Sequence, residues 1–407
     1  MRRLHPVVDI VSDFGHTAIK ERYCSGEPNR FWRCYTDVAM SRGLFILHVL
    51  LLVTVASTGY AVMEGVRHED LSAGATASNG ASCAGQPKRE FSHSPYYTGI
   101  LFDAHLHLPS SSSVVSSIST RMGLPTSAWG DTLSYEYLAC ILRSEGTRGA
   151  FGFHLLTRYS LSGEVGAAKA LDKKKSGVAH FLMPTFVNRS IDPSVESVRK
   201  LVDKNPDLFK GIGELKFFDQ TSPDSPKVHP YYQLAEKHGL IVMIHPFDDQ
   251  KDATIKVIRQ YPKVTFLLHG IDSEGSRPGD SGEDNVGWVL NLLRTYHNVY
   301  YSVDDAPIWQ IQPRGEKIDR DTAIGHLRSD FNTELDRLTR RWKTGIESFP
   351  DRILSGTDRW YDWHYDREAS ALIVEFKRAF IGRLSPEVRE QYAYKNAEKL
   401  LASVKTP

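Results

Sequence analysis

The chain has 407 residues, of which 41% are hydrophobic and 24% are charged, and its 50 basic and 49 acidic residues leave a formal net charge of +1. These values are near the globular average and exclude wholesale disorder, a collagen-like fibre and a polytopic membrane protein. Without a basic excess, nucleic acid is not expected as a partner. The four cysteines form no CxxC pair and no dense framework. A disulfide scaffold or a cysteine-based zinc site is therefore not indicated, and any metal would need nitrogen and oxygen ligands.

The first distinctive element is the apolar run of residues 44–63. It barely reaches the roughly 20 residues needed to cross a bilayer, and its dense first part, followed by small residues, has signal-peptide length. We predict a signal-peptide hydrophobic region or a membrane anchor over 44–63, after an N-terminal leader or cytoplasmic segment over 1–43. A buried core helix is disfavoured because no amphipathic helices flank the run. Met40 would open a conventional signal peptide, in which case residues 1–39 are not translated.

Both interpretations of the apolar run place the rest of the chain outside the cytoplasm. The protein is expected to be exported, to the periplasm or the extracellular space, or anchored in a membrane with its folded part outside. Contact with the membrane is expected only through residues 44–63, and only if that segment is not cleaved.

Residues 64–96 are rich in Ser, Ala, Gly and charge, and they are predicted to form a flexible linker without catalytic residues. The remaining residues, 97–405, have the length of a single α/β barrel. Apolar runs without strict polar alternation suit parallel strands that are covered on both faces. Eight such runs, the strand number of a distorted (β/α)8 TIM barrel, recur at residues 99–104, 149–153, 178–183, 211–215, 240–244, 264–268, 299–303 and 352–355.

Helix signals between these runs support the alternation of strands and helices. Asp192, followed by a proline, predicts an N-cap before an apolar helical stripe that starts at Val195. Gly239 predicts a helix end before the fifth run. The crossovers over 109–148 and 304–351 are less regular and must contain extra loop or helix. A doubly wound open sheet is the structural alternative, but no GxGxxG follows the first run.

Ionisable residues follow five of the eight runs, at the strand ends where parallel barrels carry their functional side chains. The first run ends in an HxH motif, whose imidazoles share one face because strand side chains alternate. A carboxylate follows the fourth and the eighth runs, and a histidine follows the fifth and the sixth. Buried carboxylates are costly without a partner, so a cation or a hydrogen-bond network is expected. The candidate metal ligands are His105, His107, Glu214, His245, His269 and Asp358.

The motifs FDAHLH, GIGELK, IVMIHP and RILSGTD, with the C-terminal YKNAEKLL, resemble the amidohydrolase superfamily, and most closely its amidohydrolase-related (amidohydrolase 2) branch of metal-dependent hydrolases. The branch shares features with TatD-type deoxyribonucleases. The resemblance covers about residues 97–405. It implies a distorted TIM barrel with one or two divalent ions, commonly zinc. His105, His107, His245 and Asp358 would be the core ligands, while Glu214 and His269 would complete a second metal site or serve the substrate.

The sequence departs from some relatives at the fourth strand. Those relatives bridge two metals with a carboxylated lysine, whereas this sequence has both Glu214 and Lys216 there. The bridging residue is therefore open at this point. We favour Glu214, because a carboxylate needs no modification to bind two ions.

These residues predict a metal-dependent hydrolase whose metal-activated water attacks a carbonyl-type bond, a lactone, ester or amide, of a small-molecule substrate. Asp358 is the expected general base, and His269 or the metal would polarise the electrophile. Asp103 shares the face of the HxH pair and is expected either to fix a histidine tautomer or to be a cap. The alternatives are a metal-dependent non-oxidative decarboxylase of the same superfamily, a TatD-like nuclease, and a barrel that has decayed into a binding module.

Overall fold

The computed structural model describes residues 5–13, 16–24, 89–91, 94–108, 134–186, 191–217, 221–271, 283–304 and 319–404. The chain divides into two compact units, Met1–Gly74 and Ala75–Pro407. In the first unit, β1 (His5–Asp13) and β2 (His16–Cys24) pair antiparallel. The predicted segment 44–63 lies outside the described residues, as does the predicted linker 64–96 apart from residues 89–91 and 94–96.

The second unit is built on eight parallel strands that are hydrogen-bonded to one another in chain order. Each strand coincides with one of the eight predicted apolar runs, so the strand prediction is confirmed. The strands are β3 (Leu101–His107), β4 (Thr147–Leu156), β5 (Val178–Pro184), β6 (Phe209–Lys216), β7 (Ile241–His245), β8 (Thr265–Leu268), β9 (Val299–Asp304) and β10 (Ile353–Gly356).

The first and last strands of this sheet meet, which gives a nearly closed barrel. Leu106 of β3 forms a parallel bridge with Arg359, just after β10. The backbone N–H of Asp358 donates to the carbonyl oxygen of His105 across the same seam, at 3.0 Å. The predicted distorted (β/α)8 barrel is therefore confirmed, and the open doubly wound sheet is wrong.

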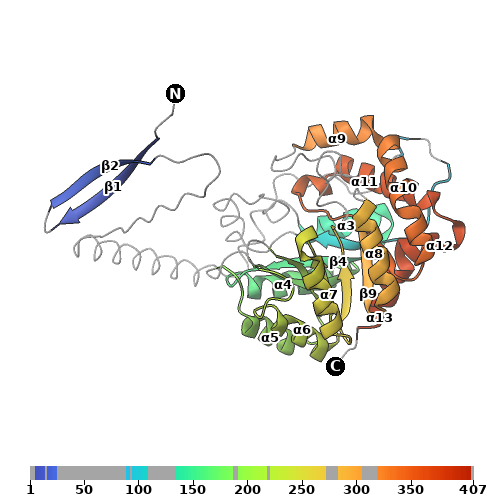
Figure 1. Cartoon of the computed structure of the whole chain (residues 1–407). Helices are drawn as coiled ribbons and strands as arrows, with labels where there is room; N and C mark the ends of the chain where they lie inside the picture. Colours follow the sequence, from blue (N-terminus) through green and yellow to red (C-terminus); the bar gives the residue numbers. More distant parts are fainter. Residues whose placement is uncertain are drawn as a thin grey trace. The chain divides into compact units, whose positions relative to one another are not determined.

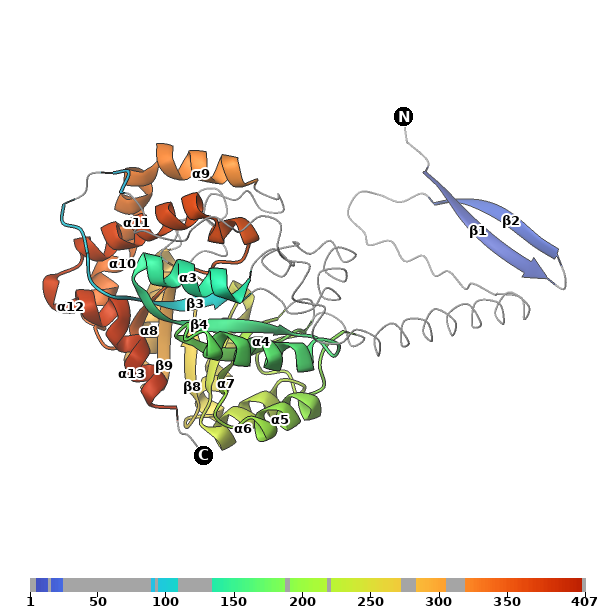
Figure 2. The ribbon, with the colours of Figure 1, turned by 180° about the vertical axis from the view of Figure 1, so that it is seen from behind.

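Helices between consecutive strands surround the barrel, as Figures 1 and 2 show from two sides. The last crossover contains two helices, α9 (Arg320–Ser329) and α10 (Phe331–Ser348), as its length requires. Within the described ranges, none of the helices combines the length and the apolar character needed to span a bilayer. The helices are α3 (Tyr135–Glu145), α4 (Leu161–Lys173), α5 (Val195–Lys204), α6 (His229–His238), α7 (Lys251–Gln260), α8 (Glu283–Thr295), α9 (Arg320–Ser329), α10 (Phe331–Ser348), α11 (Arg367–Arg383), α12 (Pro386–Glu390) and α13 (Asn396–Ala402).

Local sequence signals account for the helix ends, with one correction. Gly239 follows α6 in the left-handed conformation (φ 64°), as predicted from its position. Helix α5 begins at Val195, but its N-cap is Ser194 and not Asp192. The Ser194 hydroxyl accepts from the backbone N–H of Ser197 at 3.1 Å, so a capping side chain closer to the apolar stripe replaces the predicted aspartate.

Some of the large apolar side chains of the strands pack in a buried cluster that also includes helix residues. Phe151 and Phe153 of β4 each lie with ring centroids 5.0 Å from that of Phe181 on β5. The Phe153 ring also lies edge-on to the ring of His105, at 5.0 Å between centroids. The polar residues at the strand ends are therefore packed directly against a low-dielectric core, which strengthens electrostatic interactions among them.

Candidate metal centre

The structure brings all six predicted ligands together at the carboxyl ends of five strands. His105 and His107 are on β3, Glu214 is on β6, His245 ends β7, His269 directly follows β8, and Asp358 follows β10 by two residues. All are buried except Asp358, whose side chain is 16% exposed. The residues therefore converge from positions more than 250 residues apart in the chain.

Two of these residues form a group with Asp358. The Nε2 atom of His107 lies 3.1 Å from Asp358 Oδ1, and the Nε2 atom of His105 lies 3.4 Å from the same oxygen. Glu214 Oε2 faces the same two nitrogens, at 3.4 Å from His107 and 3.8 Å from His105. This first group thus presents two imidazole nitrogens and two carboxylates to one point.

The other oxygen of Glu214 faces the remaining two histidines. Its Oε1 atom lies 2.6 Å from Nδ1 of His245 and 3.0 Å from Nε2 of His269. The Glu214 carboxylate therefore stands between both groups. The Nζ atom of Lys216, two residues further along β6, lies 5.7 Å from the centroid of the Phe247 ring.

The inward direction of Glu214 depends on an irregularity in β6. The register with β7 shifts between Ile212 and Leu215, and Gly213 adopts φ 136°, a conformation that favours glycine. A Cβ atom on Gly213 would lie 2.5 Å from the carbonyl oxygen of Met243, so only glycine fits. Simple alternation would place Glu214 on the same face as Ile212, whose side chain packs in the apolar cluster that includes helix residues. The register shift follows Ile212, and the Glu214 side chain faces the histidines instead.

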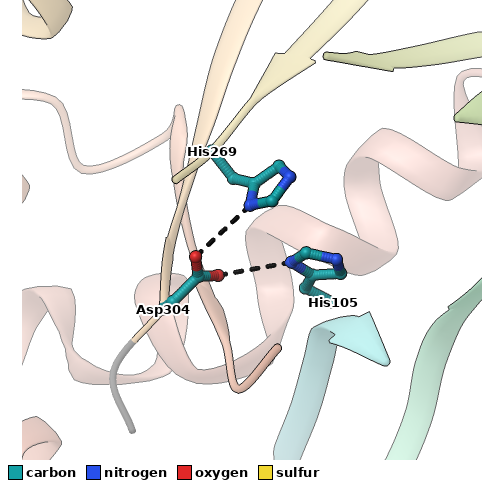
Figure 3. A group of neighbouring side chains, drawn as sticks. All are labelled: His105, His269 and Asp304. Carbon is teal, nitrogen blue, oxygen red and sulfur yellow. Dashed lines mark hydrogen bonds and ion pairs between the residues drawn. The ribbon is translucent and has the colours of Figure 1, made fainter. Parts of the chain in front are cut away.

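A seventh residue, Asp304 at the end of β9, belongs to the cluster and was missed by sequence reasoning. Its Oδ1 atom lies 3.4 Å from Nδ1 of His105, and its Oδ2 atom lies 3.3 Å from Nδ1 of His269 (Figure 3). The signal was available, because Asp304 is the first ionisable residue after the seventh apolar run. It was passed over because the ligand pattern of the family resemblance contains no residue from that strand.

The charges of the cluster perturb one another. Burial would raise the pKa of Glu214, but the imidazoles of His269 and His245 hold it well below its ordinary value. Burial would lower the pKa of His269, yet the Glu214 and Asp304 carboxylates raise it overall. For His107, burial dominates and lowers the pKa despite the contact with Asp358. The Glu214 carboxylate is thus held ionised although it is buried.

This donor set fits divalent cations. Three carboxylates bring three negative charges into a largely buried cluster, and such charges are costly unless cations balance them. The ligand atoms of His105, His107 and Asp358 lie within 4.8 Å of one another, as do those of Glu214, His245 and His269. Ligands bound about 2.1 Å from one tetrahedral zinc ion stand about 3.4 Å apart, which is close to the separations of 3.1 to 3.8 Å in the first group. Each group therefore has the donor atoms for one ion, and the first group also has the spacing.

Neighbouring side chains hold the HxH segment in place. Asp103 is buried, and its carboxylate accepts from the backbone N–H of Thr357 at 3.0 Å and from that of His105 at 3.1 Å. Asp103 therefore fixes the backbone across the β3–β10 seam, rather than an imidazole tautomer as one of the two expectations held. The Tyr365 hydroxyl donates to the carbonyl oxygen of His107 at 2.5 Å, and the Trp360 ring lies edge-on to the His107 ring at 4.2 Å.

Comparisons with known proteins agree with this arrangement. A family model described as amidohydrolase matches residues 185–402, which is more than half of the chain. The chain belongs to the amidohydrolase family. It is accordingly an enzyme, and the matched segment contains Glu214, His245, His269, Asp304 and Asp358 of the cluster. No match to the sequence is found among curated proteins.

Solved structures of similar proteins include enzymes of different activities. A candidate 2-pyrone-4,6-dicarboxylic acid hydrolase from Pseudomonas putida is 15% identical, with 75% of this chain and 98% of that chain covered and a TM-score of 0.49. An amidohydrolase from Burkholderia multivorans is 12% identical (75% and 99% covered, TM-score 0.48). A 5-carboxyvanillate decarboxylase from Novosphingobium aromaticivorans, complexed with manganese, is 14% identical (75% and 96% covered, TM-score 0.43). Similarities this distant do not assign a reaction or a substrate to this chain.

Proposed function

We propose that this amidohydrolase is a metal-dependent hydrolase that cleaves a carbonyl-type bond, a lactone, ester or amide, of a small molecule. The observation that carries the proposal is the convergence of four imidazoles and three carboxylates at one end of the barrel. Of the three acids, only Asp358 has a side chain more than 10% exposed. A divalent ion in such a site supplies an acidified water, with a pKa near 7, and polarises a carbonyl oxygen.

The proposed ligands divide into the two groups described above. His105, His107 and Asp358 would hold one ion, and His245 and His269 would hold a second. Glu214 would bridge them, because each of its oxygens faces a different group, and this geometry supports Glu214 over Lys216 for the bridge. Zinc is the metal we propose, since imidazole and carboxylate ligands at these separations suit it.

The exposure of their side chains assigns different roles to Asp358 and His269. Asp358 is the acid that an incoming water or substrate meets, so we assign it the role of general base, which takes up a proton and returns it to the leaving group. His269 has no exposed surface, and both of its ring nitrogens face carboxylates, Glu214 and Asp304. This engagement supports a ligand role for His269 over direct contact with the substrate.

The Glu214 carboxylate also helps to distinguish hydrolysis from non-oxidative decarboxylation. The sites of non-oxidative decarboxylases of the superfamily generally lack a carboxylate at the fourth strand, so Glu214 argues against that reaction. A bridging carboxylate between two ions suits attack by water on a carbonyl group. Hydrolysis is therefore the reaction that the cluster supports best.

The proposal is tested on purified protein by measuring its metal content and its activity on a panel of lactones, esters, amides and phosphoesters, together with aromatic acids. We expect one or two divalent ions per chain and hydrolysis of at least one carbonyl substrate, which is lost with a chelator and restored by zinc. Release of carbon dioxide from an aromatic acid without hydrolysis, or cleavage of nucleic acid alone, would overturn the proposed reaction.

The role of Asp358 has its own test. Asp358→Asn should reduce kcat by at least about 100-fold, because an amide cannot accept the proton, while the thermal unfolding temperature stays near that of the wild type. Asp330→Asn, at the N-cap position of α10 and outside the metal centre, is the control and should keep full activity. Full activity of Asp358→Asn would remove the proposed base.

We also propose that the enzyme works outside the cytoplasm. The apolar run of residues 44–63 supports this proposal, and so does Cys140, which is disulfide-bonded, because disulfides persist in oxidising compartments. Fractionation of cells that produce the full chain, with mass spectrometry of the mature N-terminus, tests it. Recovery of the uncleaved protein in the cytosol would contradict it.

A further inference from the structure

We propose that Asp304 is a positioning residue that fixes the tautomers of two histidines, one from each metal-binding group, and thereby makes the two groups act as a unit. The inference rests on the proposed metal centre. It adds a residue and a role that the predicted ligand set does not contain.

The geometry is symmetrical about the Asp304 carboxylate. One oxygen faces Nδ1 of His105 at 3.4 Å, and the other faces Nδ1 of His269 at 3.3 Å (Figure 3). His105 belongs to the group with Asp358, and His269 belongs to the group with Glu214. The two imidazoles are also in contact, edge to face, with centroids 4.1 Å apart. A single side chain from β9 therefore contacts one ring from each group.

The chemistry of the carboxylate determines which ring nitrogens carry protons. An ionised carboxylate only accepts hydrogen bonds, so both Nδ1 atoms must carry a hydrogen to donate to it. In a neutral imidazole, Nε2 then has a lone pair. The Nε2 atoms of His105 and His269 are the ones that face Asp358 and Glu214, at 3.4 and 3.0 Å. Asp304 thus turns the metal-binding nitrogen of both rings towards the cluster in the form that can bind a cation.

Both contacts are longer than an ordinary hydrogen bond. A cation on the opposite nitrogen of each ring withdraws electron density and makes the Nδ1 hydrogen a stronger donor, so the carboxylate and the cations reinforce each other. The carboxylate is buried, with 8% of its side chain exposed, and water therefore competes little for its oxygens. Loss of the Asp304 charge should therefore weaken metal binding in both groups.

The substitution Asp304→Asn distinguishes a role of Asp304 in fixing the histidine tautomers from a purely steric role. In Asp304→Asn the side chain keeps its shape but offers one acceptor and one donor. It can accept from one Nδ1, while its amino group faces the other Nδ1 and favours the tautomer with the hydrogen on Nε2. That ring could then bind a cation through Nε2 only by giving up its hydrogen bond with the substituted amide side chain. Asp304→Ala removes the constraint from both rings but also leaves a cavity.

The experiment uses the full-length protein labelled with ¹⁵N in its histidine rings, together with zinc titration against a competing chelator. For the wild type we expect Nδ1–H signals for His105 and His269 that persist when zinc is added. Asp304→Asn should move the hydrogen of one of these rings to Nε2 and weaken zinc binding at least about 10-fold. Asp304→Ala should also weaken zinc binding.

A matched control comes from another carboxylate that contacts an imidazole. Asp172 Oδ1 lies 3.1 Å from Nε2 of His180, and neither residue is part of the metal centre. Asp172→Asn should leave zinc affinity and the two tautomers unchanged. Unaltered zinc affinity and tautomers in Asp304→Asn would overturn the proposal. So would the loss of both wild-type Nδ1–H signals on adding zinc, because Asp304 and these nitrogens would then bind the ion themselves.

The outcome is separable from that of the proposed hydrolysis. The tautomers of the metal-free protein report on Asp304 whatever reaction the enzyme catalyses. A wild type that binds zinc as described but hydrolyses nothing on the panel would refute the proposed reaction and leave the role of Asp304 intact.

Discussion

Gly270, the residue after His269, offers a sharp test of the metal centre without altering a ligand. It adopts φ 76°, and a Cβ atom placed on it would lie 2.5 Å from Cε1, 2.6 Å from Nε2 and 2.8 Å from Nδ1 of His245. Ordinary contact begins at 3.4 Å. The substitution Gly270→Ala therefore forces the His245 ring to move by about 1 Å, or the backbone to shift by a similar amount.

The expected magnitude has two parts. The left-handed conformation of a residue with a Cβ atom costs roughly 1–2 kcal/mol of stability. The ring displacement adds a specific effect, because metal–ligand distances tolerate only about 0.2 Å. A shift of about 1 Å at His245, whose Nδ1 lies 2.6 Å from Glu214, should weaken metal binding at least about 10-fold, or about 1.4 kcal/mol.

Zinc affinity, measured by competition with a chelator, and stability, measured by urea unfolding, separate these parts. Gly239→Ala is the matched control, since Gly239 has a similar φ of 64° at the end of α6 but belongs to no metal-binding group. Both variants should lose comparable stability in the metal-free state. Only Gly270→Ala should lose zinc affinity and, with it, activity.

One result would refute this reasoning. If Gly270→Ala binds zinc as tightly as Gly239→Ala, then the His245 ring is either free to move or not a ligand. In either case the close contact between Gly270 and His245 would not constrain the metal centre, whatever the effect on stability.

Two further variants test the surroundings of the cluster. Glu145 and Arg359 form an ion pair at 2.7 Å, and both side chains are 1% exposed. Glu145→Gln should therefore lower the free energy of unfolding in urea by about 3–5 kcal/mol. Glu196→Gln, which removes one partner of an exposed pair with Arg199, should cause no measurable loss, and equal losses in the two variants would contradict the argument from burial. His364 is buried, its Nδ1 accepts the backbone N–H of Trp360 at 3.0 Å, and burial holds its pKa well below 6.5. The unfolded chain then binds one more proton below about pH 6.5, so stability should fall as pH falls, by up to about 1.4 kcal/mol per unit. His364→Asn, which keeps an acceptor but does not titrate, should flatten that slope in urea unfolding at pH 7.5, 6.5 and 5.5, and an unchanged slope would assign the acid sensitivity to other groups.

The barrel and most of the polar residues at the carboxyl ends of its strands could be predicted from local sequence patterns. Eight apolar runs gave eight strands because a parallel strand buried on both faces needs a continuous apolar sequence. His245, His269 and Asp358 could be located because each is among the first ionisable residues after such a run. Since the carboxyl ends of all strands in a parallel barrel meet at one face, position along the chain was enough to predict that these side chains lie together.

Other features of the centre were decided only by tertiary structure. Simple alternation along β6 would place Glu214 on the same face as Ile212, yet the register with β7 shifts after Ile212 and the Glu214 carboxylate lies between the two groups. Asp304 carries no motif, and its importance comes from the two rings that β3 and β8 bring to its oxygens. The sequence by itself determined which residue types end each strand, because the point at which an apolar run stops is a local property. Which carboxylate faces which imidazole depends on the register between neighbouring strands, and register is set by packing across the barrel.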